Sequence, residues 1–197
     1  MPGAWAHDDF PAVRDQVPTI IAAATVGFAG FRVIVVLVSG GLWAGYAKLS
    51  AEKQRSWSNR WTSTLHSAVS AYGGYCNLVD PALADDMLFA LNDMHFIASG
   101  ISCGYFLYDT CLYLDPAYRE QERRAGAGLA QTLIHHIFVL ACFPIGQYYN
   151  TAAGYGTGAF LFFGEVTNVN LHLVWILRTA GYERTMLCTF EVIPTTT

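Results

Sequence analysis

Five long runs of mainly apolar residues follow one another along the chain, separated by short polar connectors. A helix needs about 20 such residues to cross a hydrocarbon core about 30 Å thick. The runs cover residues 19–47, 61–79, 96–114, 128–145 and 153–177. They predict an all-α, polytopic membrane helix bundle with about five transmembrane helices. Polar residues interrupt the last four runs, so a soluble helical bundle is the alternative interpretation.

The runs also divide the chain into three parts. Residues 1–18 form a predicted N-terminal segment on the luminal or exterior side, 19–178 a transmembrane domain and 179–197 a short cytosolic tail. The first segment carries three aspartates and one arginine. This is the wrong flank for a cleaved signal peptide or an Arg-rich transit peptide. We therefore expect the first apolar run to be retained as a helix.

Basic residues gather on alternate connectors between the runs. Nine of the eleven lysines and arginines are Lys48, Lys53, Arg55, Arg60, Arg119, Arg123, Arg124, Arg178 and Arg184. They lie between the first and second runs, between the third and fourth, and after the fifth, whereas the connector 81–93 is purely acidic. The positive-inside rule then places the N-terminus in the lumen or exterior and the C-terminus in the cytosol. A soluble bundle has no reason to sort its charges in this way.

Composition excludes two other classes of protein. Hydrophobic residues make up 53% of the chain and charged residues only 13%, whereas about a quarter of an average soluble domain is charged. The net charge of -4 leaves no basic patch for phosphates, so no nucleic acid partner is expected. The five cysteines show no CxxC spacing, so neither a disulfide framework nor a zinc site is predicted.

Two of the predicted helices carry small residues four positions apart. Gly100 and Gly104 lie in the third run, and Gly154 and Gly158 in the fifth. In lipid this spacing lets helix backbones approach closely, so both pairs predict packing seams. Residues 100–104 also spell G-x-S-x-G, the nucleophile-elbow pattern of hydrolases. That motif needs a strand before it and a helix after it, and its position inside one predicted helix argues against a hydrolase.

Ionisable side chains interrupt four of the predicted helices at a similar depth. At a rise of about 1.5 Å per residue, each lies roughly 9 to 11 Å below the cytosolic surface. The four are His66, Asp109, His135 and His172. Because an isolated ionisable group in lipid is costly, we expect them to share a polar pocket that opens toward the cytosol. Glu165 is expected to lie deeper, near the bilayer midplane.

The adjacent His135 and His136 suit acid–base or nucleophilic chemistry. A carboxylate such as Asp109, bonded to one ring nitrogen, would leave the other nitrogen as a general base or nucleophile near neutral pH. A metal site is the competing use, but adjacent side chains point about 100° apart on a helix and do not easily reach one ion. No metal is predicted. Taken singly, His66 and His172 are also explained by backbone or tyrosine partners inside a bundle.

Arg32 lies in the middle of the first predicted helix. Among the apolar runs, Glu165 is the carboxylate that the sequence offers opposite it. An arginine in plain lipid costs a few to over ten kcal/mol, depending on the estimate. We therefore expect Arg32 to pair with Glu165 across the bundle, or a phospholipid or partner helix to contact Arg32 in the groove between the first and fifth helices.

Four short motifs in the same order carry a resemblance to a known family. They are Trp57-Ser-Asn-Arg60 with Ser63-Thr-Leu-His66, then Gly104-Tyr-Phe-Leu-Tyr-Asp109, then Ile134-His-His136, then Phe163-Gly-Glu-Val-Thr-Asn168. Over residues 48–178 the chain resembles the TLC-domain family, the membrane fold shared by translocating-chain-associating proteins, ceramide synthases and several lipid-homeostasis proteins. Within the family it looks most like the TLC domain-containing proteins.

The resemblance implies a bundle that handles long-chain membrane lipids in the endoplasmic reticulum or a connected membrane. In ceramide synthases the histidine pair serves the transfer of an acyl group from acyl-CoA to a sphingoid amine. Carried over, His135 and His136 become the acyl-transfer residues, with Asp109 and His66 lining the same chamber. The other candidate lipid- or substrate-binding residues are Arg32, Trp57, Arg60, Tyr105, Glu165 and His172. Acyl-CoA is the implied substrate, and no cofactor is expected.

Two departures from the family pattern lead to a second hypothesis. No acidic residue follows the histidine pair before Glu165, whereas the ceramide synthase motif continues with further aspartates. The family also usually has another helix after the Glu165 segment. The alternative is a non-catalytic, lipid-binding structural subunit of a larger membrane complex, in which a partner transmembrane helix covers the open wall. An organellar inner membrane fits such a subunit. A truncated chain is the third possibility.

Overall fold

Helices form the regular structure of residues 13–87, 90–124, 129–149 and 154–182, which the computed structural model describes. Five long helices correspond to the five predicted runs: α1 (Val17–Leu42), α2 (Ala51–Leu78), α4 (Asp93–Leu112), α6 (Leu129–Tyr149) and α7 (Gly154–Thr179). The shorter elements are η2 (Arg14–Gln16), η3 (Tyr46–Lys48), α3 (Pro81–Asp85) and α5 (Pro116–Arg124). The all-α prediction is confirmed. Most of the predicted N-terminal segment and tail lies outside the described residues.

Helix α2 begins at Ala51, earlier than the apolar pattern predicts. The reason is a cap, because the side chain of Ser50 accepts a hydrogen bond from the backbone N–H of Lys53 at 3.3 Å. A capping side chain satisfies one of the N–H groups that a helix start leaves without a partner. Hydropathy missed these turns because they are rich in charge. Arg55 and Arg60 therefore project from a regular helix, at the end of α2 nearest the basic connectors.

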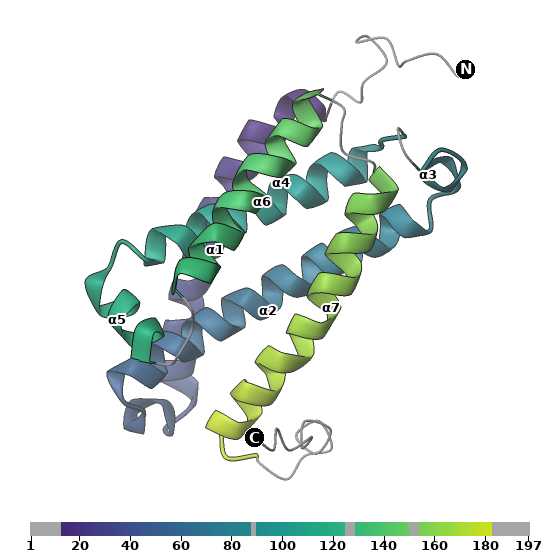
Figure 1. Cartoon of the computed structure of the whole chain (residues 1–197). Coiled ribbons are helices and arrows are strands. Elements are labelled where there is room, and N and C mark those ends of the chain that lie inside the picture. The colour runs from purple at the N-terminus through teal and green to yellow at the C-terminus, as the bar shows by residue number, and fades with distance from the viewer. Residues whose placement is uncertain (1–12, 88–89, 125–128, 150–153, 183–197) are drawn as a thin grey trace, which may run out of the picture.

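Helix α2 lies at the centre of the bundle. It packs against α7, α4 and α1, while α4 also contacts α1 and α6 (Figure 1). Helix α6 packs mainly on α4 and leaves a row of apolar side chains exposed: Ile134, Ile137 and Phe138. The central position of α2 matters because this helix carries much of the polar chemistry of the chain.

Two aromatic clusters hold the long helices together. The first joins α1, α4 and α6 through Phe28, Tyr105, Phe106, Tyr108 and Val139. The second, which we call the tryptophan cluster, joins α1, η3, α2 and α7 through Trp43, Tyr46, Trp57, Trp61 and Trp175. Tryptophan and tyrosine are enriched where membrane proteins meet the lipid head groups. The tryptophan cluster therefore marks one expected membrane interface.

Both predicted glycine seams are packing contacts. A Cβ atom on Gly104 would lie 2.5 Å from Cβ of Ala24 on α1, and one on Gly158 would lie 2.6 Å from Cβ of Asn77 on α2. Real side chains do not approach so closely, so a larger residue at either position must push two helices apart. Ser102, at the centre of G-x-S-x-G, lies fully buried inside α4. Because helical residues directly precede this serine, residues 100–104 do not form the strand-to-helix turn of a nucleophile elbow.

Among the residues that the structure describes, two helices are long and apolar enough to cross a bilayer, Arg14–Leu42 and Gly154–Thr179. Their apolar side chains point outward: Leu37 is 68% exposed on α1 and Phe163 is 65% exposed on α7. A soluble protein would bury such helices in its core, so the outward apolar faces support a membrane bundle. Thr132–Pro144 in α6 is a shorter apolar stretch. The count of five spans stays a prediction.

The connectors lie at two opposite ends of the bundle. Helix α3 lies at one end, whereas α5, the turn between α1 and α2, and the end of α7 lie at the other (Figure 1). Lys48, Lys53, Arg119 and Arg178 belong to the second group of elements, and we call that end the basic end. The alternating charge pattern of the sequence thus becomes a separation in space.

We predict that the basic end faces the cytosol and that α3 faces the lumen or exterior. Single cysteines placed at Ala84 and at Ala117, in a background without other cysteines, test this in sealed vesicles with a membrane-impermeant maleimide. The reagent added from the cytosolic side should label position 117 and not position 84. Labelling of position 84 from the cytosol would invert the topology.

We predict that Gly104→Val lowers the free energy of unfolding by about 1–3 kcal/mol, because the added side chain overpacks the contact between α4 and α1. Gly27→Val is the matched control, since no atom lies within 4 Å of a Cβ built on Gly27. Thermal unfolding of the purified protein in a mild detergent measures both variants. Equal destabilisation by the two substitutions would contradict the packing role of Gly104.

Candidate functional site

A polar pocket of about 210 Å³ lies toward the basic end of the bundle. Its lining comes from five helices: Ser56, Asn59, Arg60 and Ser63 of α2, Tyr105, Asp109 and Tyr113 of α4, Tyr118 of α5, Thr132 of α6 and His172 of α7. Four of the residues predicted as site residues therefore share one cavity, namely Arg60, Tyr105, Asp109 and His172. The structure thus gathers polar side chains from well-separated parts of the sequence. We call this cavity the polar pocket.

Asp109 connects the polar pocket to the histidine pair. Its Oδ2 lies 3.5 Å from Nε2 of His136 on α6, and both side chains are more than nine-tenths buried. The other ring nitrogen of His136, Nδ1, lies 3.1 Å from the hydroxyl of Thr110. His136 does not line the polar pocket itself. It stands behind Asp109, which does.

The polar contacts of His136 connect Asp109 to the backbone of α4. The Thr110 hydroxyl donates to the carbonyl of Phe106 at 2.7 Å. A hydroxyl that donates to a carbonyl can accept from a ring nitrogen, so the 3.1 Å contact with Nδ1 favours the His136 tautomer that carries its proton there. The other ring nitrogen, Nε2, then faces the carboxyl group of Asp109.

A second polar contact, between Arg60 and His172, holds the guanidinium of Arg60 in place at the polar pocket. A guanidinium nitrogen of Arg60 lies 2.9 Å from Nδ1 of His172. Because arginine can only donate, Nδ1 accepts and the neutral ring carries its proton on Nε2. The guanidinium also lies over the ring of Trp175, 5.8 Å from the ring centre, which adds a cation–π attraction. Helix α7 thus holds Arg60 on the wall of the pocket.

Helix α5 is anchored across the basic end by hydrogen bonds to α2. The amide of Asn59 donates to the hydroxyl of Tyr118 at 2.9 Å. Gln121 bonds to α2 twice: its oxygen accepts from Nε of Arg55 at 3.1 Å, and its amide donates to the hydroxyl of Ser56 at 2.6 Å. These contacts bring Tyr118 to the lining of the polar pocket. The short basic connector is thereby part of the site.

His66 belongs to a different polar group, between α2, α4 and α7. Its Nδ1 lies 4.0 Å from the carboxylate of Glu165, and its Nε2 lies 3.4 Å from the hydroxyl of Ser102. The same Glu165 oxygen accepts hydrogen bonds from Ser67 at 2.7 Å and from Asn168 at 3.2 Å. We call this set the buried polar cluster. Glu165 and His66 therefore contact the same set of polar side chains.

The aromatic ring of Phe106 separates the two polar groups. It makes edge contacts with His66 at 5.4 Å and with His136 at 5.1 Å between ring centres. On its other side His66 stacks on Tyr105, with the rings 3.9 Å apart and nearly parallel. The predicted single constellation of His66, Asp109 and the histidine pair is therefore only partly formed. Asp109 and His136 meet, whereas His66 is held apart by aromatic packing.

The two adjacent histidines have different environments. His136 is 4% exposed, whereas the side chain of His135 is exposed and contacts the edge of Phe106 at 5.2 Å. This follows from the rotation of about 100° between neighbouring residues on a helix. Residue type alone did not distinguish them. The structure assigns the contact with Asp109 to His136.

The structure places Arg32 and Trp57 outside the polar pocket. Of the two partners expected for Arg32, Glu165 is not the one observed: Nε of Arg32 donates to the hydroxyl of Ser58 at 3.3 Å, while Glu165 belongs to the buried polar cluster. Contact of Arg32 with a phospholipid or a partner helix stays a prediction. Trp57 is buried in the tryptophan cluster, and its indole N–H donates to Ser39 at 2.9 Å.

Several lining residues were not predicted from the sequence. They are Ser56, Asn59, Ser63, Tyr113, Tyr118 and Thr132, together with Thr110 behind the pocket. One signal was available on α2, where polar residues at 56, 59, 63, 67 and 70 recur at steps of three and four. That spacing marks one face of a helix. Within the described residues, no group of three or more histidine, cysteine or acidic side chains is placed to hold a metal ion.

Comparison with known proteins gives two matches. The family model described as TRAM_LAG1_CLN8: TLC domain matches residues 56–197, which is more than half of the chain. The chain is also 28% identical to TLC domain-containing protein 2 of Danio rerio over 129 residues, covering 65% of this chain and 49% of that protein. The chain thus spans about half the length of the curated relative that it matches. No solved structure matches it.

We predict that Glu165→Ala lowers the free energy of unfolding by about 1–3 kcal/mol, because it leaves buried donors of Ser67 and Asn168 without an acceptor. The matched control is Glu120→Ala on α5, where an exposed ion pair with Arg123 should contribute less than about 1 kcal/mol. Thermal or chemical unfolding in detergent compares the two. A larger effect at Glu120 would contradict the structural role of the buried polar cluster.

Proposed function

Because this chain belongs to the TLC domain family, whose members are membrane proteins generally tied to lipid metabolism, we propose that it handles long-chain lipids in the polar pocket. The observation that supports this most directly is the Asp109 and His136 pair. A carboxyl group faces a polar cavity in a membrane bundle, with a histidine 3.5 Å behind it. Buried ionisable groups inside membrane bundles mark substrate sites and proton relays.

The remaining lining of the polar pocket suits the polar end of a lipid. Arg60 supplies a positive charge that is fixed by His172 and Trp175, and arginine binds phosphate and carboxylate oxygens in a bidentate manner. The hydroxyls of Ser63 and Tyr105 lie 2.7 Å apart on the same wall and offer donors and acceptors for hydroxyl, amine or carbonyl groups. The acyl chain would extend from the pocket toward the apolar faces of the helices.

The specific reaction that we propose is acyl transfer from an acyl-CoA to the amine or hydroxyl of a second lipid. The attacking nitrogen or oxygen forms a bond to the thioester carbonyl carbon and passes its proton to Asp109. The carbon–sulfur bond then breaks, and the departing thiolate takes up that proton from Asp109. His136 acts as a positioning residue, since it lies 3.5 Å from Asp109 and does not line the pocket. No oxidant, metal or bound cofactor enters this balance.

The volume of the polar pocket favours a second candidate function. Ligand sites for drug-sized molecules usually measure roughly 300–1,000 Å³, and the polar pocket measures about 210 Å³. A cavity of this size holds a head group without holding a reacting acyl-CoA beside it. In this alternative the protein binds lipids without catalysis, as a subunit of a membrane complex, and a partner transmembrane helix covers the exposed row of Ile134, Ile137 and Phe138.

We predict that Asp109→Asn and His136→Ala each reduce acyl transfer by about 100-fold or more, because the first removes the group that accepts the proton and the second removes the side chain that orients it. His135→Ala is the matched control, and its rate should stay within about threefold of the wild type because this side chain is exposed. The assay follows acyl-CoA consumption and product formation with a long-chain sphingoid amine in mild detergent.

The outcomes separate the two candidates. Equal losses in His135→Ala and His136→Ala would contradict the role that the geometry gives to His136. An absence of transfer by the wild-type protein, together with retention of native lipid that Arg60→Met abolishes, would favour the non-catalytic function. Placement in the endoplasmic reticulum or a connected membrane is part of the first proposal, and imaging of the tagged protein with organelle markers tests it.

A further inference from the structure

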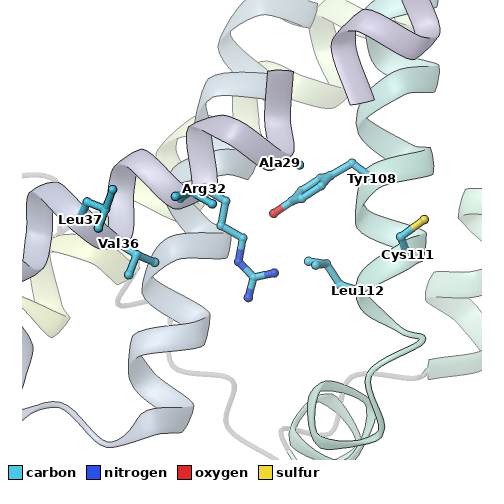
Figure 2. A pocket seen from close by; sticks show the side chains of 8 residues that line it. Ala29, Arg32, Val36, Leu37, Tyr108, Cys111 and Leu112 are labelled. Carbon is cyan, nitrogen blue, oxygen red and sulfur yellow. The ribbon is translucent and has the colours of Figure 1, made fainter. Parts of the chain in front are cut away.

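A second cavity, of about 480 Å³, opens between α1 and α4 (Figure 2). Most of its wall is apolar and comes from Ala29, Val33, Val36 and Leu37 of α1 and Leu112 of α4. Val33 and Leu37 are 58% and 68% exposed, so this wall faces the surroundings of the bundle. The guanidinium of Arg32 projects into the cavity, and the ring of Tyr108 lines it with its buried hydroxyl directed toward α1 (Figure 2). We call this cavity the Arg32 groove.

The charge of Arg32 is not balanced by a carboxylate among the residues that the structure describes. Its observed contact is the 3.3 Å hydrogen bond from Nε to the neutral hydroxyl of Ser58. Glu165, the carboxylate expected opposite it, is bonded to Ser67 and Asn168. A guanidinium has five N–H donors in a planar fork that matches phosphate oxygens. The groove therefore combines an apolar wall with one uncompensated cation, a pairing that is costly in lipid.

The guanidinium of Arg32 lies close to the tryptophan cluster, which marks an expected membrane interface. Ser58, its partner, lies between Trp57 and Trp61, two members of the tryptophan cluster. Trp57 in turn donates to Ser39 near the end of α1. Arginine side chains that start in the apolar layer commonly extend toward the interface in this way. The guanidinium of Arg32 thus lies beside the tryptophan cluster, the expected membrane interface, with the apolar wall next to it.

We propose that the Arg32 groove binds one anionic phospholipid, with the phosphate on Arg32 and an acyl chain along Val33 and Leu37. We infer that the bound phospholipid carries a net negative charge, because it must balance the positive charge of Arg32. A zwitterionic lipid brings its own ammonium group and leaves the charge of Arg32 unbalanced, whereas an anionic lipid neutralises it. Free phosphate would leave the apolar wall unfilled. The site is separate from the polar pocket and does not depend on the function proposed there.

Native mass spectrometry of the purified protein tests the proposal, with phosphatidylserine and phosphatidylcholine of identical acyl chains titrated in detergent. We expect the wild type to bind phosphatidylserine roughly fivefold or more tightly than phosphatidylcholine. Arg32→Leu should abolish this preference, and Arg32→Lys should retain part of it. Arg14→Gln removes one positive charge far along the chain from the groove and should leave the preference unchanged.

A second pair of variants tests the location without changing charge. Val33 lines the groove, whereas its neighbour Ile34 is 55% exposed and does not line it. Val33→Trp should fill the groove and weaken phosphatidylserine binding, and Ile34→Trp should not. If Arg32→Leu fails to fold, the Val33→Trp and Arg32→Lys results decide the question.

Three results would overturn the proposal. One is equal affinity of the wild type for the two phospholipids. Another is a preference for phosphatidylserine that persists in Arg32→Leu or is lost equally in Arg14→Gln. The third is displacement of bound phosphatidylserine by millimolar inorganic phosphate, which would show that the groove holds an anion rather than a lipid.

Discussion

The architecture depends on one constraint: polar side chains inside a bundle with apolar outer faces need partners within the bundle. Helix α2 shows how this is met. Its threonine and serine hydroxyls bond to carbonyls one turn earlier, as Thr62 does to Ser58 and Thr64 to Arg60. Others reach neighbouring helices, such as Ser70 to Ser102 and Ser67 to Glu165. Because α7, α4 and α1 pack around it, the most polar long helix has become the central one.

Aromatic packing determines which polar side chains contact one another. The ring of Phe106 contacts both His66 and His136, and Tyr105 stacks on the other side of His66. Aromatic rings bury a large apolar area. Here they prevent direct contact between the titratable groups of the buried polar cluster and the Asp109–His136 pair in the low-dielectric interior. The buried polar cluster around Glu165 thereby serves packing, whereas Asp109 is left facing the polar pocket. A change of one aromatic side chain here would alter chemistry as well as stability.

Helix α2 contributes to the polar pocket and also contacts Arg32. Arg60 of α2 lines the polar pocket, and Ser58, two residues away, accepts a hydrogen bond from Arg32. The Arg32 groove itself is lined by α1 and α4. Trp57, next to Ser58, belongs to the tryptophan cluster. The packing of α2 against α1 therefore links the two proposed lipid sites.

The sequence by itself determined the all-α bundle, the positions of its five long helices, the sorting of basic connectors to one end, both glycine seams and the family. These are properties of hydropathy, charge and short motifs, which are local along the chain. It also singled out Asp109, Arg60, Tyr105 and His172, which share the polar pocket. Only the tertiary structure decided that His136 rather than His135 meets Asp109, and that Arg32 and Glu165 do not pair. The physical reason is that the rotation and spacing of the helices are set by close contacts, such as Gly104 against Ala24, and by packed aromatic rings. Because neighbouring residues of a helix point in different directions, this rotation determines which of two adjacent side chains is buried and which is exposed.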